Sequence, residues 1–247
     1  MRYFIRLQYN GARYHGWQTQ PNAMTVQQCI EEALSTLLRT PTTITGAGRT
    51  DAGVNARMMI AHFDSEMPIA DTNDIIKRLN GILQSDIAIQ AIFPVHDQAH
   101  ARFDATSRTY KYFVAQERMP FRSHFSWYCS RKLDFNIMNE AATTLLTVSD
   151  FTSFSKLHTD TLTNICHVSD AKWDQWNDLW VFTITADRFL RNMVRAIVGT
   201  LIDVGTHRIS LDRFSSIVEA KNRCSAGTSM PANALFLWNI TYPYPIL

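Results

Sequence analysis

The sequence has 247 residues, of which 46% are hydrophobic and 19% charged, a composition typical of a protein that buries a core. No apolar run is long enough to span a bilayer, and the amino terminus lacks the hydrophobic block of a signal peptide, so we expect a cytoplasmic protein without a membrane segment. The net charge of +2 permits a nucleic-acid partner only if the positive charge is clustered.

The cysteines and histidines do not predict a metal site. The four cysteines show no C-x-x-C spacing, and the eight histidines include no H-E-x-x-H pair. We therefore expect packed thiols in a reducing compartment and no structural metal.

The first half of the chain alternates between strand and helix patterns. Hydrophobic periodicity predicts, in order, a strand over residues 3–9, a helix from the cap Thr25 to residue 38, strands over 42–45 and 57–63, a helix capped near residue 71 or 72, and a strand over 87–93. This β-α-β-β-α-β order is that of a ferredoxin-like unit. We expect both helices on one face of an antiparallel sheet, with the other face free.

Two loops of this half stand out. Residues 13–18 combine a cation, two aromatic residues and polar donors, which fits either a surface loop with one packed Trp or an RNA contact. Residues 46–56 carry glycines that allow positive φ, Arg49, and a single carboxylate, Asp51. Asp51 is either a reactive group held rigidly at a cleft or a turn residue that satisfies backbone N–H groups. The loop is not a phosphate-binding loop, because no Gly-Lys-Ser/Thr follows.

The second half repeats the plan. We predict strands over residues 109–116, 166–173, 179–186 and 235–242, and helices over 136–148, 189–204 and 212–220. The sequence thus favours an α+β protein with two domains, residues 1–100 and 101–247. Their sheets are expected to join and to form a cleft that Asp51 enters from the first half.

Arg195 is the best candidate to complete a site, because its neighbours are apolar and an arginine buried there needs an anionic partner. Asp51 is an attractive partner, since a guanidinium holds a carboxylate bidentately. Arg188 and Arg191 precede Arg195 at spacings that predict one side of the same helix. The alternative is that Arg195 pairs with a structural acid and the other two form a solvated face.

Aromatic residues of the second half offer further contacts. Tyr110 and Tyr112 should share one face of their strand, where a tyrosine could stack on a base or simply form half of a packed pair. Cations and aromatics then alternate in a run that suits phosphates and unpaired bases, or a packed loop with a solvated rim: Arg118, Phe121, Arg122, His124, Phe125, Trp127, Tyr128, Arg131 and Lys132.

Five stretches, in order, resemble the tRNA pseudouridine synthase A (TruA) family. They are residues 46–54 (Gly-Ala-Gly-Arg-Thr-Asp-Ala-Gly-Val), 101–105 (Ala-Arg-Phe-Asp-Ala), 108–112 (Arg-Thr-Tyr-Lys-Tyr), 150–154 (Asp-Phe-Thr-Ser-Phe) and 189–199 (Phe-Leu-Arg-Asn-Met-Val-Arg-Ala-Ile-Val-Gly). Two positions depart from the family pattern: Asn55 replaces a usual histidine, and Ala234 replaces a usual glycine.

The resemblance implies the pseudouridine synthase fold, with an RNA-binding cleft between two ferredoxin-like halves. It implies isomerisation of uridine to pseudouridine in the anticodon stem-loop of tRNA, at positions 38, 39 and 40, by a homodimer that needs no cofactor. Asp51 would be the catalytic carboxylate, Tyr110 would contact the flipped base, and Arg195 would pair with Asp51. Further substrate-binding residues would be Arg49, Arg102, Arg188, Arg191 and Leu235.

Two other functions are alternatives to this activity. A non-catalytic tRNA-binding protein or folding chaperone on the same scaffold would not need Asp51, Tyr110 and Arg195 together. A hydrolase that uses Asp51 as a nucleophile would want a metal cluster or a second catalytic acid, and the sequence offers neither.

Overall fold

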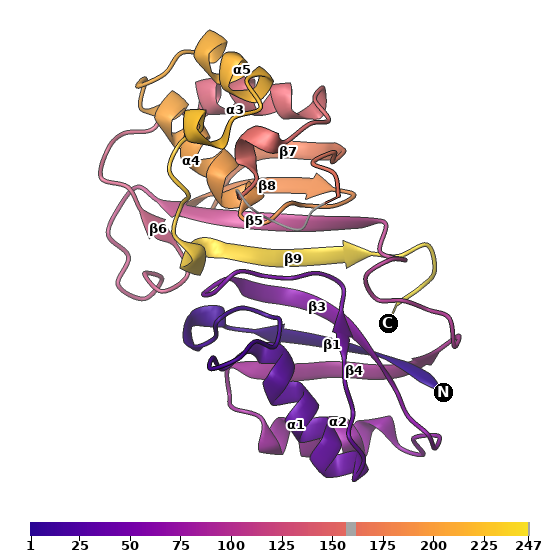
Figure 1. The fold of residues 1–247 in the computed structure, drawn as a ribbon. Helices are drawn as coiled ribbons and strands as arrows, with labels where there is room; N and C mark the ends of the chain where they lie inside the picture. Colours follow the sequence, from indigo (N-terminus) through magenta and orange to yellow (C-terminus); the bar gives the residue numbers. More distant parts are fainter. Residues whose placement is uncertain (157–161, 247) are drawn as a thin grey trace. The chain divides into compact units, whose positions relative to one another are not determined.

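In the computed structural model, residues 1–156 and 162–246 are described, and the chain divides into two compact units (Figure 1). The first unit holds Met1–Thr106 together with Leu237–Leu247, and the second holds Ser107–Phe236. The expected domains, 1–100 and 101–247, differ from these units mainly at the end of the chain. The last strand, β9 (Leu235–Thr241), hydrogen-bonds to β3 of the first unit. Most of β9 and the residues after it therefore belong to the first unit.

The first unit follows the predicted order of strands and helices. Its elements are β1 (Arg2–Tyr9), α1 (Val26–Leu38), β2 (Thr45–Gly46), β3 (Asn55–Asp64), α2 (Thr72–Ile82) and β4 (Ile87–Val95). The strand order is β4-β1-β3-β9, with β2 also on β3, and β1 runs antiparallel to both of its neighbours. Two ordered caps begin the helices: Thr25 accepts from the Gln28 N–H, and Asp71 accepts from two backbone N–H groups of α2.

The helices cover one face of this sheet, as predicted (Figure 1). The opposite face is covered at one end. Phe4 is completely buried there, with ring centroids 6.1 Å from Phe93 and 5.5 Å from Tyr242. The expectation of an open face fails at this end, because the segment after β9 folds back over it, whereas Gln8 and Gln90 further along the face are exposed.

The same face buries a histidine at the end of β3. The His62 side chain is 7% exposed, and its Nδ1 accepts a hydrogen bond from the Ala101 N–H at 3.1 Å. Burial, together with the positive charges of Arg2 and His100, lowers the pKa of His62 to about 4. The neutral imidazole is thus the form that the fold requires, since a protonated Nδ1 could no longer accept this bond.

This histidine predicts acid sensitivity. His62 titrates near 6.5 when unfolded and near 4 when folded, so the unfolded chain binds more protons between these pH values and stability must fall as pH drops through that window. We expect the free energy of unfolding to decrease by about 3 kcal/mol across the window on account of this group. Urea unfolding at a series of pH values measures it. In the control His62→Gln, residue 62 cannot titrate, so the free energy of unfolding should decrease less across this window. An equal decrease in both proteins would contradict the role of His62 in acid sensitivity.

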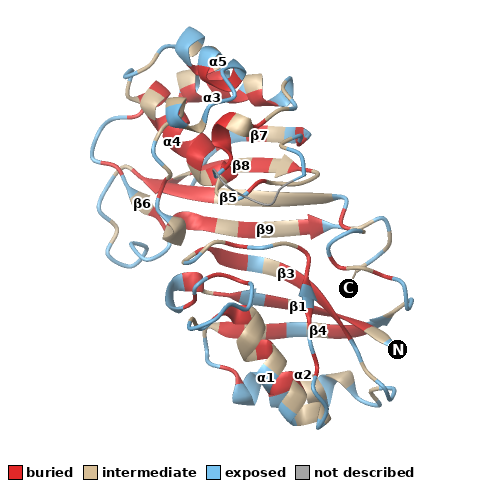
Figure 2. Ribbon diagram, viewed as in Figure 1, coloured by how far each residue is buried: buried red, intermediate tan, exposed pale blue. Residues whose placement is uncertain are grey.

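The second unit contains β5 (Ser107–Ala115), β6 (Trp127–Tyr128), α3 (Phe135–Thr143), β7 (Val168–Trp176), β8 (Leu179–Ala186), α4 (Met193–Gly205) and α5 (Leu211–Glu219). Its strands are ordered β5-β8-β7, antiparallel, and the two-residue β6 pairs with β5 in parallel. The helices lie to one side of these strands (Figure 1). Figure 2 shows α4 buried along most of its length.

Two predicted helices of this unit are shorter than expected. Residues 136–148 form α3 only to Thr143, followed by a 3-10 turn over Thr144–Leu146. The helix predicted over 189–204 begins instead at Met193, because Asn192 adopts the left-handed conformation with φ of 66°. Residues 187–192 are therefore a connection and not a helical turn.

Within the described residues, none of the helices combines the length and the apolar character needed to cross a membrane.

Candidate active site

Asp51 stands at the first position of a tight turn. The Val54 N–H donates to the Asp51 carbonyl at 3.1 Å, and Gly53, the third residue of the turn, has φ of 78°. Positive φ at this position is the requirement of a type II turn, which explains the glycine. Asp51 itself is only partly buried.

Three bonds hold the turn from outside. The buried Tyr9 hydroxyl lies 2.8 Å from the Thr50 hydroxyl, the Trp17 N–H donates to the Thr50 carbonyl at 3.2 Å, and the Gly53 N–H donates to the Tyr14 carbonyl at 3.3 Å. Residues on both sides of Asp51 are thus bonded to β1 and to the loop that follows it. Such bonding reduces the conformational freedom of the carboxylate.

The loop over residues 13–18 is the main support of this turn. Trp17 and Tyr14 are 2% and 3% exposed, so the packed-Trp interpretation holds for both aromatics. Gly16 has φ of 90°, and a Cβ there would lie 2.4 Å from the Thr50 carbonyl oxygen. A side chain at this position would displace the backbone next to Asp51.

The unusual Asn55 has a structural role. Its side chain is 1% exposed, and Oδ1 accepts from the Gly11 N–H at 2.9 Å. It therefore ties the start of β3 to the 3-10 turn Gly11–Arg13 that follows β1, close to the Asp51 turn. Ala234, the other departure from the family pattern, is fully buried.

The two predicted binding residues of the first unit lie at different places. Arg49 is exposed on the Asp51 loop itself. Arg102 is also exposed, but it belongs to a turn bonded to His62, near the far end of β3. Because His62 is seven residues along β3 from Asn55, about 23 Å of strand separates the two ends. The unit therefore does not bring Arg102 together with Asp51.

In the second unit, Arg195 lies in the first turn of α4 and is partly exposed, less buried than the sequence suggested. Its Nε donates to the Met230 carbonyl, and the Met230 N–H donates back to the Arg195 carbonyl at 3.1 Å. The guanidinium is thus anchored beside residues 230–231. The Tyr112 hydroxyl donates to the Pro231 carbonyl at 3.1 Å. Burial raises the pKa of this hydroxyl, and the positive charge of Arg195 opposes that rise.

Tyr110 is placed as its strand pattern predicted. Opposite Ile184 on β8, it shares a face of β5 with Tyr112, which is opposite Phe182. Tyr112 is completely buried, whereas Tyr110 is partly exposed and meets Phe189 edge to face at 5.0 Å. Of the two tyrosines, only Tyr110 can therefore face a ligand.

The other candidates of this unit surround the start of α4. Arg188 and Arg191 precede the helix, so the prediction that helical spacing aligns them with Arg195 was wrong. The Asp187 carboxylate, which also accepts from the His167 backbone N–H, accepts from the Arg188 N–H at 2.7 Å and so fixes this connection. Leu235 begins β9 and is buried.

Sequence reasoning did not predict the contacts that the supporting residues make. Thr50, Tyr112 and Met230 act through a hydroxyl or a backbone carbonyl that meets a distant segment, and no local pattern marks such contacts. Among the described residues, no group of three His, Cys, Asp or Glu could hold a metal ion.

A model of pseudouridine synthases matches the chain over residues 6–104 and 141–243, with the description "tRNA pseudouridine synthase". The match contains the Asp51 loop, Arg195 and the start of β9, and it defines the chain as an isomerase of the pseudouridine synthase class.

Full-length relatives narrow this class. The chain is 60% identical to tRNA pseudouridine synthase A of Parabacteroides distasonis, over 98% of this chain and 96% of that protein. Identity is 55% to the protein of that name from Bacteroides fragilis (99% and 98% covered) and 37% to the one from Bacillus subtilis (98% and 99% covered). The chain belongs to the tRNA pseudouridine synthase A family.

Proposed function

We propose that this protein isomerises uridine to pseudouridine at positions 38, 39 and 40 in the anticodon stem-loop of tRNAs, with Asp51 as the catalytic carboxylate. The observation that carries the proposal is the Asp51 turn, in which a partly exposed aspartate stands on backbone bonded to β1 and to the loop that follows it. A target base within a stem must be extruded before chemistry, and a rigidly held reactive group suits such a base.

The reaction breaks the bond between the ribose and the base nitrogen and forms a bond to carbon 5 of the same base. An ionised Asp51 either attacks as a nucleophile or removes a ribose proton to give a glycal. In both routes the proton at carbon 5 is released, and the base stays within the pocket while it turns. The overall change is an isomerisation, so the proposed site includes neither a cofactor nor a metal.

Two residues of the second unit complete the proposed site. Arg195 would pair with Asp51 and keep it ionised as water is excluded. Tyr110 would contact the flipped uracil, and its partly exposed ring supports this role. The proposed substrate contacts are Arg49, Arg102, Arg188, Arg191 and Leu235.

The proposed architecture has two ferredoxin-like halves whose sheets join, with the RNA-binding cleft between them. The element order of the first unit supports this, and the second unit repeats the β-α-β-β-α part of it, with the short strand β6 and the helix α5 in addition. We further propose a cytoplasmic homodimer in which one tRNA contacts both subunits.

Release of tritium from tRNA labelled at carbon 5 of uridine tests the activity. We expect the wild-type protein to release tritium from tRNA with uridine at positions 38–40, and to release none when cytidine replaces those uridines. Binding of tRNA without any release would favour the non-catalytic chaperone. Equal release from both tRNAs would assign the activity to other positions.

A further inference from the structure

Residues 116–126 form a loop that leaves the end of β5 and returns to it. Its return strand, β6, pairs in parallel with the last residues of β5. Gln116 closes the base: its Nε2 donates to the carbonyls of Cys129 and Arg131 at 3.0 and 3.1 Å, and its Oε1 accepts from the Leu133 N–H at 3.0 Å. Compact loops with closed ends of this kind often carry function.

The loop is also ordered internally. The Arg122 N–H donates to the Met119 carbonyl and the Phe125 N–H to the Arg122 carbonyl, both at 3.0 Å, which makes two successive turns. The Ser126 hydroxyl donates to the Arg122 carbonyl at 2.9 Å. Outside the loop, the Phe125 ring lies 6.0 Å from that of Phe236. The apex is therefore held in a defined position on its unit.

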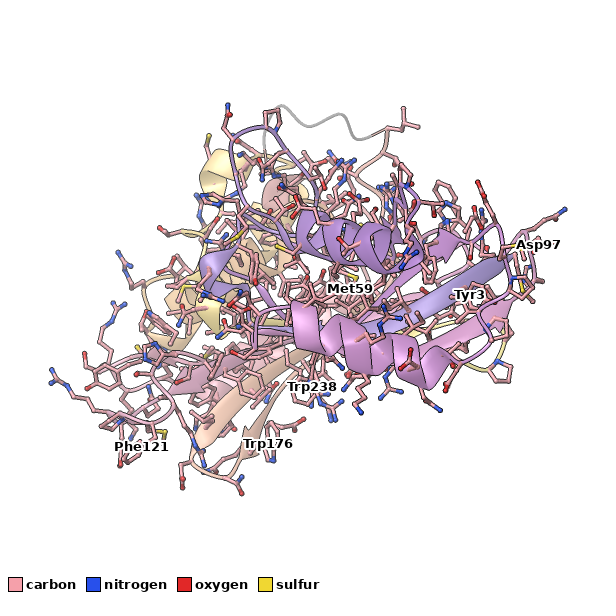
Figure 3. All side chains as sticks on the ribbon, turned by 90° about the horizontal axis from the view of Figure 1, so that it is seen from below. Tyr3, Met59, Asp97, Phe121, Trp176 and Trp238 are labelled. Carbon is pink, nitrogen blue, oxygen red and sulfur yellow. The ribbon has the colours of Figure 1, made fainter. Side chains whose placement is uncertain are left out.

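This ordered apex exposes aromatic side chains. Phe121 is fully exposed, and Phe125 and Tyr128 are each 42% exposed. Figure 3 shows Phe121 on the outward part of the loop. Internal packing does not explain why Phe121 is a phenylalanine, because its ring contacts solvent and gains nothing from burial.

Positive charge accompanies these rings. Residues 116–132 contain four cations, Arg118, Arg122, Arg131 and Lys132, against one acid, Glu117, so this segment carries +3 whereas the whole chain carries +2. The guanidinium of Arg118 lies 5.9 Å from the Tyr128 ring. Arg122 is 3.9 Å from Asp178, a long pair between exposed side chains that stabilises little. Both arginines remain accessible to an anionic partner.

We propose that the 116–126 loop is a second RNA-binding surface, on which Phe121 stacks against an unpaired base of the tRNA while Arg118 and Arg122 contact phosphates. Cations interleaved with exposed aromatics fit RNA, because cations contact phosphates and aromatic rings stack on unpaired bases. The loop lies outside both stretches that match the family model. The proposal rests on tRNA as substrate and adds a contact separate from the Asp51 turn.

The test measures tRNA affinity directly by fluorescence anisotropy with unmodified tRNA, and turnover by tritium release. We expect Phe121→Ala to raise the Kd about tenfold, the loss of one base–aromatic stack, and to leave kcat at saturating tRNA unchanged. Phe121→Trp should restore the affinity. The control Met67→Ala removes a different exposed apolar side chain, that of Met67, which is 73% exposed. This variant should leave the Kd for tRNA unchanged.

The two arginines have a separate signature. The double variant Arg118→Gln, Arg122→Gln should reduce the slope of log K against log salt by about 1.4 to 1.8, as expected for two lost phosphate contacts. An unchanged Kd for Phe121→Ala would overturn the proposal. So would a change of molecular mass in sedimentation with unaltered tRNA affinity, which would assign the loop to contact between copies. Because binding is measured without turnover, absence of tritium release by the wild type would refute the proposed activity alone.

Discussion

Asp51→Asn is expected to reduce tritium release from labelled tRNA by on the order of 10⁴-fold or more, the usual loss when a nucleophile or general base is removed. An amide of nearly the same size neither attacks carbon nor takes up a ribose proton. The turn should survive, because its hydrogen bond runs from the Val54 N–H to the backbone carbonyl of residue 51. Anisotropy should therefore give a tRNA Kd within about twofold of wild type, since the proposed substrate contacts keep their side chains.

The measurement compares Asp51→Asn with Thr50→Val, a neighbouring variant that removes the hydrogen bond to the Tyr9 hydroxyl but keeps the carboxylate. Thr50→Val should lower stability by about 1 kcal/mol and retain most of its turnover, since one buried hydrogen bond is lost and no reacting group. Substantial activity of Asp51→Asn would reject the assignment of the catalytic residue. Equal loss in both variants would show that the turn, and not the carboxylate, limits the reaction.

Arg195→Met is expected to lower kcat/KM by about 10² to 10³-fold. If Arg195 pairs with Asp51, the variant removes the cation that positions the carboxylate and stabilises charge in the transition state. Initial rates of tritium release at low tRNA concentration measure kcat/KM.

Arg195 also bonds to the Met230 carbonyl, so the variant is expected to be less stable. Arg195→Lys separates the two roles, because it keeps the positive charge but loses the planar donor fork. We expect its kcat/KM to fall less than that of Arg195→Met. A lower Tm for Arg195→Met with an unchanged kcat/KM would restrict Arg195 to a structural role.

Much of the fold follows from local patterns in the chain. Alternating residues of β1 and the helical stripe after the Thr25 cap predicted their elements correctly, because burial of one face imposes a period of two on strands and of 3.6 on helices. The glycines around Asp51 similarly predicted a turn with a residue at positive φ, and Gly53 is that residue.

Other features follow from a backbone conformation that has no periodic pattern, or from residues that are far apart in the sequence. The start of α4 at Met193 follows from the left-handed Asn192, a conformation that helical periodicity does not reveal. The burial of Phe4 depends on Tyr242 at the other end of the chain, and the support of Thr50 on Tyr9. The tertiary packing determines which residues form such pairs, because each chain segment contains several polar and apolar groups that could form a similar contact.

The sequence by itself therefore determined the order of most strands and helices, the turn at Asp51 and the family. Each of these depends on residues that are neighbours in the chain or that stand at a fixed spacing. Only the tertiary structure decided that residues 13–18 support the Asp51 turn and that Arg102 lies at the end of β3 far from this turn. It also decided that Phe121 is fully exposed on an ordered loop. The physical reason is that long-range contacts form between backbone and side-chain groups without a sequence signature of their own.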